Sequence, residues 1–312
     1  MHIDWAIAAA GLAIGFIVGL TGMGGGALMT PVLVLIFGID PTKAVGSDIV
    51  VSLLMKPVGG GVHLRRGTVH LKLAAWLVAG SVPSAFVAVW LLHFLTNPEQ
   101  LNTIVQFALG VALLMASAAL AAKGAFSGRR RVEHALDTIE VKPLPTLLIG
   151  VFGGAMVGIT SVGSGSLMMP LLLMLYPILT ARQLVGTDLI QAIPLVASAA
   201  LAHAVFVHDI ELSLTASLVI GALPGAYLGA RVSSRAPDRL IRPALAVILI
   251  VSGLKMLKVP SMVVGLVALA LVAVATAFVV RHRHHHPDAV GPEDGSPAAV
   301  PGAVPEAAEL PQ

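Results

Sequence analysis

Long apolar stretches alternate with short polar connections along almost the whole chain. A helix that crosses about 30 Å of hydrocarbon needs about 20 apolar residues, and most of the stretches meet this length. The pattern therefore predicts an all-α integral membrane protein. The stretches are 5–20, 26–37, 44–62, 69–94, 100–123, 144–159, 165–178, 184–206, 212–230, 240–257 and 260–280.

Two of the stretches, 26–37 and 165–178, are too short to cross. As helices they would extend only about 18–21 Å. Each follows directly on a glycine-rich segment, which favours a hairpin that enters the membrane and turns near its middle. Irregular backbone is tolerated at that depth only inside protein or beside a water-filled cavity. Two short, tilted spans are the alternative.

The two glycine-rich segments are copies of one motif, about 140 positions apart. The first runs from Gly19 to Pro31 and the second from Gly158 to Pro170. A duplicated membrane unit with a broken segment in each copy is typical of secondary transporters. The match continues downstream, where Gly46-Ser47-Asp48 corresponds to Gly186-Thr187-Asp188, His63 to His203, and Gly80-Ser81-Val82-Pro83 to Gly221-Ala222-Leu223-Pro224.

The charges of the connections orient the two copies. The connection 63–72 is basic and its counterpart 208–211 has no Lys or Arg, whereas 96–100 has none and its counterpart 231–242 carries several arginines. Positively charged connections stay in the cytoplasm, so equivalent connections lie on opposite sides of the membrane. This predicts an inverted-topology repeat with the N-terminus outside.

The predicted organisation follows from these patterns. Each repeat is expected to contain a Gly-rich broken or re-entrant hairpin plus about three spanning helices. Residues 287–312 have too few large apolar groups to fold, which predicts a disordered tail. The expected parts are a first membrane repeat at 1–123, a cytoplasmic linker with Arg129, Arg130 and Arg131 at 124–143, a second repeat at 144–258, an extra transmembrane helix at 259–280 and a cytoplasmic tail at 281–312.

Composition agrees with lipid as the solvent. Of the 312 residues 57% are hydrophobic and 11% are charged, whereas soluble domains carry roughly 25% charged residues. The absence of cysteine excludes disulfides and thiolate metal sites. The net charge of +3 indicates topology rather than nucleic-acid binding. The N-terminus lacks the positive region of a secretory signal, so residues 5–20 are expected to belong to the mature protein.

The glycine-rich motifs are the candidate substrate site. Glycines allow left-handed backbone, successive N–H groups form a nest for anions, and the helix that follows adds its N-terminal donors. Two such turns meeting near the midplane would suit a small oxyanion, although small residues also allow close helix packing. The predicted substrate-binding residues are Thr21, Gly22, Gly24, Gly25, Gly26, Thr160, Ser161, Gly163, Ser164, Gly165 and Ser166.

Charges within the apolar stretches are a second signal. A charge at the bilayer centre costs at least about 2.5–3.5 kcal/mol, so it faces a cavity or a partner. Asp48 and Asp188 are equivalent, and they are candidates for coupling or for helix caps. Lys56, whose counterpart is Val196, is predicted to hold the anion or to pair with an aspartate. His203 is expected at a helix end, with proton coupling as the alternative.

An enzyme is not expected. The apolar stretches contain no His-x-x-x-His or Glu-x-x-His pair, and the chain has no phosphate-binding Gly-x-x-x-x-Gly-Lys-Ser/Thr loop. We therefore predict no catalytic residue, no cofactor and no metal site, and a small anionic substrate and the lipid bilayer as partners.

Taken together, these motifs resemble one known family. The Gly-rich motif before a short helix and Pro31, the Gly-Ser/Thr-Asp element, the turn Arg65-Arg66-Gly67 and the two Gly-x-x-Pro repeats are similar to the sulfite exporter TauE/SafE family of bacterial membrane transporters. The resemblance covers roughly residues 5–258. It implies an inner-membrane protein that moves sulfite, thiosulfate or small organosulfonates. A carrier for another anion such as a carboxylate, and a non-transporting membrane subunit, are the alternatives.

Overall fold

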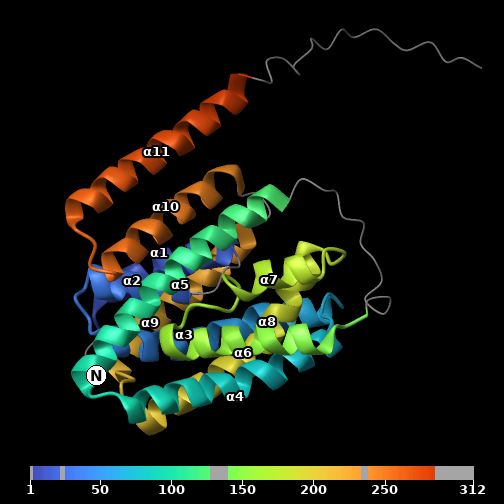
Figure 1. Cartoon of the computed structure of the whole chain (residues 1–312), viewed down its shortest axis with the longest axis vertical. Helices are drawn as coiled ribbons and strands as arrows, with labels where there is room; N and C mark the ends of the chain where they lie inside the picture. The colour runs from blue at the N-terminus through green and yellow to red at the C-terminus, as the bar shows by residue number, and fades with distance from the viewer. Residues whose placement is uncertain (1–2, 22–24, 127–139, 233–237, 285–312) are drawn as a thin grey trace, which may run out of the picture. The chain divides into compact units, whose positions relative to one another are not determined.

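The described part of the chain is helical. The computed structural model describes residues 3–21, 25–126, 140–232 and 238–284, and these contain helices and short connections but no strand. Each predicted apolar stretch coincides with one α-helix, so the all-α fold is confirmed (Figure 1). The helices are α1 (Trp5–Thr21), α2 (Gly26–Leu35), α3 (Pro41–Arg65), α4 (Leu71–Leu95), α5 (Pro98–Phe126), α6 (Pro143–Thr160), α7 (Met168–Leu175), α8 (Ala181–Ala202) with the π-helical turn η2 (His203–Val207), α9 (Leu212–Val232), α10 (Asp238–Met256) and α11 (Ser261–His284).

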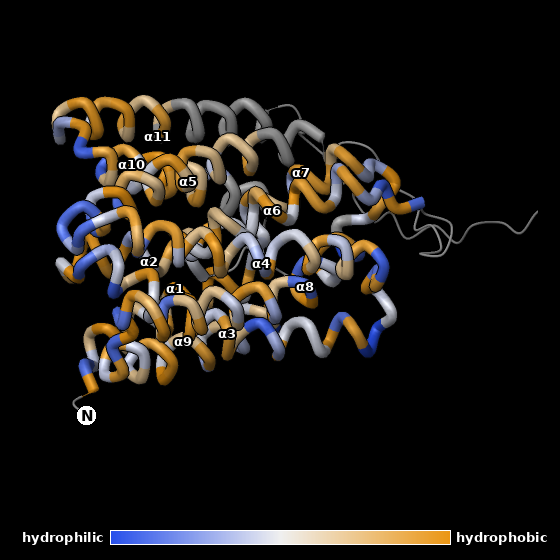
Figure 2. The backbone as a smooth tube through the Cα atoms, turned by 60° about the horizontal axis from the view of Figure 1, so that its bottom comes forward, coloured by the Kyte–Doolittle hydropathy of each residue, from blue (hydrophilic) through white to orange (hydrophobic). Residues whose placement is uncertain are grey.

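Six of the described helices are long and apolar enough to cross a membrane, judged by length and composition: α3, α4, α5, α6, α8 with η2, and α9. Their hydrophilic residues gather mainly near the helix ends (Figure 2). Large apolar side chains are exposed between these ends, for example Phe107 at 62% and Met174 at 66%. Only lipid solvates such a surface well, so the chain is a multi-pass membrane protein.

The helices α1 to α10 belong to one compact unit, residues 1–272, and residues 273–312 form a second. Within the first unit the most extensive contacts join α1 to α9, α4 to α6, α5 to α10, and α8 to both α3 and α4. In Figure 1, α4 and α6 lie side by side along their lengths.

Glycines account for the closest of these contacts. Helix α1 carries glycines at positions 11, 15 and 19, and α9 carries them at 221, 225 and 229. At each position an added Cβ would meet the backbone of the partner helix at 3.0 Å or less. Helices of membrane proteins approach this closely only where small residues line the contact.

The contact between α4 and α6 has the same construction. The glycines of α6 at 150, 154 and 158 face the backbone of Leu77, Ser81 and Ala85 on α4. These glycines correspond in the sequence repeat to those at 11, 15 and 19. Close packing therefore fixes both helices, α1 and α6, that lead into the glycine-rich motifs.

Several predictions concern residues outside the described part. These are Gly22 and Gly24 of the first motif, the linker arginines at 129–131, residues 233–237, and the tail from residue 285 onward. The predictions made for them stay predictions.

A single methyl group tests the helix contact. In Gly221→Ala the added Cβ would collide with the Ala8 carbonyl oxygen, and overpacking of this kind costs about 1–3 kcal/mol. We expect a lower melting temperature of the detergent-solubilised protein. Gly265→Ala on α11, where the Cβ meets nothing within 4 Å, should leave it unchanged or raise it. Equal melting temperatures for both variants would contradict this packing.

Candidate functional site

The two glycine-rich motifs meet in the interior of the first unit. Gly25 and Gly26 stand at the start of α2, and the residues from Ser161 to Leu167 connect α6 to α7. An added Cβ at Gly26 would overlap the Ser161 carbonyl oxygen. The backbones of the two motifs are therefore in direct contact, and only glycine fits at position 26 without a shift.

The second motif forms a compact turn. Ser161 ends α6 in the left-handed region at φ 59°, and Gly165 has φ 80°. The backbone N–H of Val162 donates to Thr160 Oγ1 at 3.1 Å. The N–H groups of Leu167 and Met168 both donate to the Gly163 carbonyl at 3.0 Å. As a result α7 begins at Met168 rather than at the predicted residue 165, because residues 164–167 form the turn.

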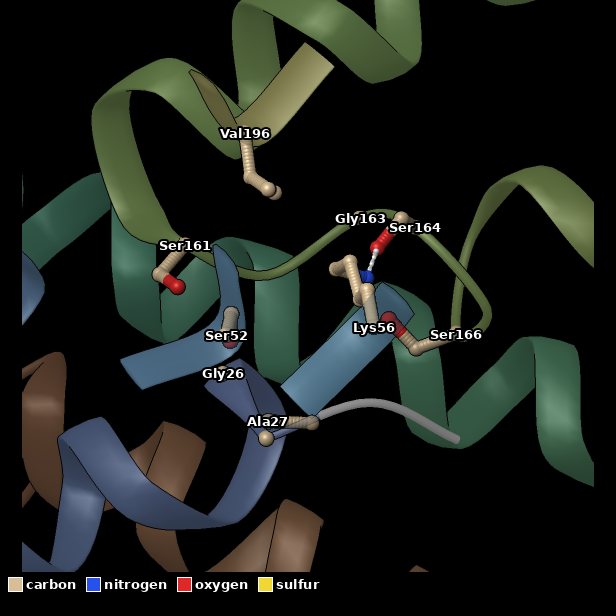
Figure 3. Close-up of a pocket in the computed structure, with 10 residues that line it drawn as sticks. Gly26, Ala27, Ser52, Lys56, Ser161, Gly163, Ser164, Ser166 and Val196 are labelled. Carbon is tan, nitrogen blue, oxygen red and sulfur yellow. Dashed lines mark hydrogen bonds between the residues drawn. The ribbon is translucent and has the colours of Figure 1, made fainter. Parts of the chain in front are cut away.

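The motifs enclose a narrow recess into which Lys56 projects from α3 (Figure 3). The Lys56 side chain is buried, and its Nζ donates a hydrogen bond to Ser164 Oγ at 2.5 Å. Val196 on α8 lies across the recess from the serine turn. The space is too narrow for a water molecule, so this conformation is closed. The lining residues are Gly25, Gly26, Ala27, Ser52, Lys56, Ser161, Gly163, Ser164, Ser166 and Val196.

One face of α3 supplies the polar side chains on the other side of the recess. Asp48, Ser52 and Lys56 are four residues apart, which places them on one helix face. Asp48 is fully buried, and its Oδ2 accepts a hydrogen bond from Thr30 Oγ1 at 3.0 Å. An added Cβ at Gly25 would lie 3.3 Å from Asp48 Oδ1 and 3.4 Å from Ser52 Oγ. The Asp48 carboxyl therefore borders the first motif.

The second intramembrane aspartate acts on the same lysine. Asp188 is buried on α8, and its Oδ1 accepts a hydrogen bond from Gln191 Nε2 at 2.9 Å. Both Asp188 and Asp48 lie close enough to Lys56 to act electrostatically on its amine. The three charges predicted from the sequence thus form one buried group.

The two motif threonines do not line the recess. Thr21 Oγ1 donates to the Ile17 carbonyl at 2.8 Å, and Thr160 Oγ1 donates to the Met156 carbonyl at 2.6 Å. Each hydroxyl proton is thus used within the threonine's own helix. The donors that reach the recess are instead Ser161, Ser164 and Ser166 of the second motif.

His203 is buried at the start of the second motif, away from the recess. Its Nε2 lies 2.8 Å from the Gly158 carbonyl oxygen, and its Nδ1 lies 2.9 Å from Asp209 Oδ2. Since a carbonyl only accepts, Nε2 carries a proton, and a second proton lies between Nδ1 and the carboxyl. The pair fastens the end of α6 to the connection before α9. An added Cβ at Gly46 would lie 2.6 Å from Asp209 Oδ1. The Asp209 carboxyl therefore also packs directly against α3.

Four residues that complete these groups were not singled out from the sequence: Ser52, Thr30, Gln191 and Asp209. Ser52 carried a usable signal, since it falls midway between Asp48 and Lys56 at helical spacing. The partners Thr30 and Gln191 come from other segments, and only the fold brings them to the aspartates. In the part of the chain that the structure describes, no group of His, Cys, Asp or Glu is arranged to hold a metal ion.

Helices of membrane-spanning length, lipid-compatible surfaces and a buried polar recess define a multi-pass helical membrane protein. The comparison with known families then assigns it. The sequence profile of the family "Sulfite exporter TauE/SafE" matches residues 7–256. The chain belongs to this family of membrane transporters.

Curated relatives agree with this assignment. The chain is 38% identical over 249 residues to the probable membrane transporter protein YjnA of Bacillus subtilis (strain 168), covering 79% of this chain and 97% of that protein. It is 24% identical over 253 residues to the probable membrane transporter protein YdhB of the same organism, covering 78% and 96%. No solved structure matches the chain significantly.

The His203–Asp209 pair yields a stability prediction. Asp209→Asn removes the negative partner of a buried imidazole, and breaking a buried pair costs about 3–5 kcal/mol. We expect a clearly lower melting temperature in detergent. Glu211→Gln is the matched control. Glu211 lies in the same connection, but its side chain is 48% exposed and its ion pair with Lys43 is long, at 4.0 Å. If Asp209→Asn melts like Glu211→Gln, the pair does not hold α6 in place.

Proposed function

We propose that this protein is a secondary transporter of small sulfur-containing anions, namely sulfite, thiosulfate or an organosulfonate, and that the recess at Lys56 binds the anion. One observation carries the proposal: the buried amine of Lys56 points at a turn that carries serine hydroxyls, where the two glycine-rich motifs touch. The family description, sulfite exporter, supports sulfur oxyanions as the substrate class.

The chemistry of the recess suits such an anion. Ser161, Ser164 and Ser166 carry hydroxyl donors, and Lys56 carries a compact positive charge with three N–H groups. The Lys56 ammonium now donates to Ser164 Oγ. A sulfur oxyanion has several acceptor oxygens, so it can take that ammonium and the serine hydroxyl at the same time. For this the recess must widen, because it does not admit a water molecule in the closed conformation.

We also infer that the two halves are inverted repeats related by an approximate two-fold axis. The helix contacts support this, because the first helix of each half packs on the fourth helix of the other: α1 on α9, and α6 on α4. The corresponding helices α3 and α8 pack on each other, as do α5 and α10. Positions that correspond in the repeat also flank the recess in pairs: Gly25 with Ser164, Ala27 with Ser166, and Lys56 with Val196.

Such an arrangement supports alternating access. In transporters built from inverted repeats, the substrate lies at the repeat interface and one part rocks against the other around it. Here Lys56 comes from the first half and Ser164 from the second, so their hydrogen bond bridges the two. An anion that replaces this bond changes the contact between the halves at the point around which they would move. The short helices α2 and α7 are then half-helices of two re-entrant hairpins.

The proposed topology has a direct test, because the chain contains no cysteine. Asn97 and Arg66 are both exposed at opposite ends of α4. In intact cells we expect Asn97→Cys to react with an impermeant maleimide and Arg66→Cys to react only after the membrane is opened. The reverse order of labelling would refute the proposed orientation.

The proposed site predicts a loss of affinity in Ser164→Ala and Lys56→Met. Losing a hydrogen bond to a charged group costs about 1.5–3 kcal/mol, which corresponds to about tenfold or more in the dissociation constant. We expect that loss for thiosulfate, measured by titration calorimetry on protein in detergent. Lys43→Met is the matched control, because Lys43 lies on the same helix but is 50% exposed.

Ser164→Ala keeps this test decisive, since it leaves all buried charges in place and should not impair folding. Unchanged thiosulfate affinity in a well-folded Ser164→Ala protein would remove the recess from the binding site. Wild-type binding of acetate as tight as that of thiosulfate would instead contradict the proposed substrate class.

A further inference from the structure

The buried group beside the recess contains two carboxyls and one amine. Asp48, Lys56 and Asp188 are all at most 7% exposed. With both carboxyls ionised and the amine protonated, this group carries one net negative charge before any substrate binds. A charge without compensation is costly in the low-dielectric interior. An anion can therefore bind well only if another positive charge arrives with it.

We propose that Asp48 offsets one of the negative charges that the anion adds by binding a proton, so that the protein carries protons together with its anion. The inference rests on the proposed anion site and extends it by naming the coupling ion and the group that holds it. The step is a proton transfer alone: an O–H bond forms at Asp48 when the anion enters and breaks when the anion leaves.

The geometry favours Asp48 over Asp188 as the proton site. The Oδ2 atom of Asp48 accepts a hydrogen bond from Thr30, whereas the buried Oδ1 makes none. Oδ1 faces Gly25, which lines the recess. Asp188, in contrast, already accepts a hydrogen bond at Oδ1 from Gln191.

The groups around Asp48 come from each neighbouring element. Its own helix supplies Ser52 and Lys56, and α8 supplies Asp188. Helix α2 supplies Thr30 and has no ionisable side chain. The Asp209 carboxyl, bonded to His203, meets α3 at Gly46. Among the other neighbours, α9 carries Arg231 in its last turn and α5 carries Glu99 in its first turn.

A proton fits this site better than a metal cation. A metal ion such as Na⁺ needs several oxygen ligands, and among the described residues no group of His, Cys, Asp or Glu is arranged to hold one. Protonation of a carboxyl needs no added volume. A protonated Asp48 also frees the Lys56 ammonium for the anion, since Lys56 then balances only Asp188.

Calorimetry and a pH indicator in weakly buffered detergent solution test the proposal with thiosulfate, whose charge is constant near neutral pH. We expect wild-type protein to take up about one proton per bound anion, and the dissociation constant to rise by up to about tenfold per pH unit. Asp48→Asn mimics the protonated carboxyl, so it should bind thiosulfate without proton uptake and with a constant affinity across pH. Asp40→Asn, which changes an exposed acid (58% exposed) before the same helix, should behave like wild type.

The outcomes separate the inference from the function on which it rests. Thiosulfate binding by wild type without proton uptake would overturn the coupling and leave the anion site intact. Binding that requires Na⁺ would overturn it in the same way. Uptake lost in Asp188→Asn but kept in Asp48→Asn would overturn the assignment to Asp48. No binding of thiosulfate, sulfite or an organosulfonate by wild type at any pH would overturn both. Proton uptake and the pH dependence of wild-type binding decide whether the anion and a proton are coupled, even if a variant does not fold.

Discussion

The structure depends on direct contact between backbones at positions that have no side chain. Lipid offers no hydrogen-bond partner, so a broken helix at membrane depth must be enclosed by protein. The glycine faces of α1 and α6 bring these helices against α9 and α4. At the ends of the same two helices, Gly26 touches the Ser161 carbonyl. The close packing of the helices therefore also positions the two motifs that form the recess.

The two halves share this construction but differ in their chemistry. The first half contributes the lysine and bare glycine backbone, and the second contributes three serine hydroxyls around the same recess. Val196 stands where a strict repeat would put a second lysine.

Much of the fold was accessible from the sequence. Apolar length gave the helices, because membrane solvation depends mainly on that property, and the glycine-rich motifs located the recess at Gly25, Gly26 and Ser164. The glycine spacing at 11, 15 and 19 was an available signal for the contact of α1 with α9. The hydrogen bonds of Thr21 and Thr160 to their own helices were not accessible, because a hydroxyl that bonds back to its own helix looks the same in sequence as one that faces a ligand. The hydrogen bonds of Thr30 and Gln191 to the two aspartates were not accessible either, because only tertiary packing brings these side chains together.

The central claim is that a sulfur oxyanion binds between the two motifs beside Lys56. Selenite has the shape and charge of sulfite, and selenium scatters X-rays anomalously. In crystals grown with selenite, we predict one dominant anomalous peak within hydrogen-bond distance of Lys56 Nζ and the Ser164 hydroxyl. A dominant peak elsewhere, for instance beside His203 or at the surface arginines Arg65 and Arg66, would contradict the account.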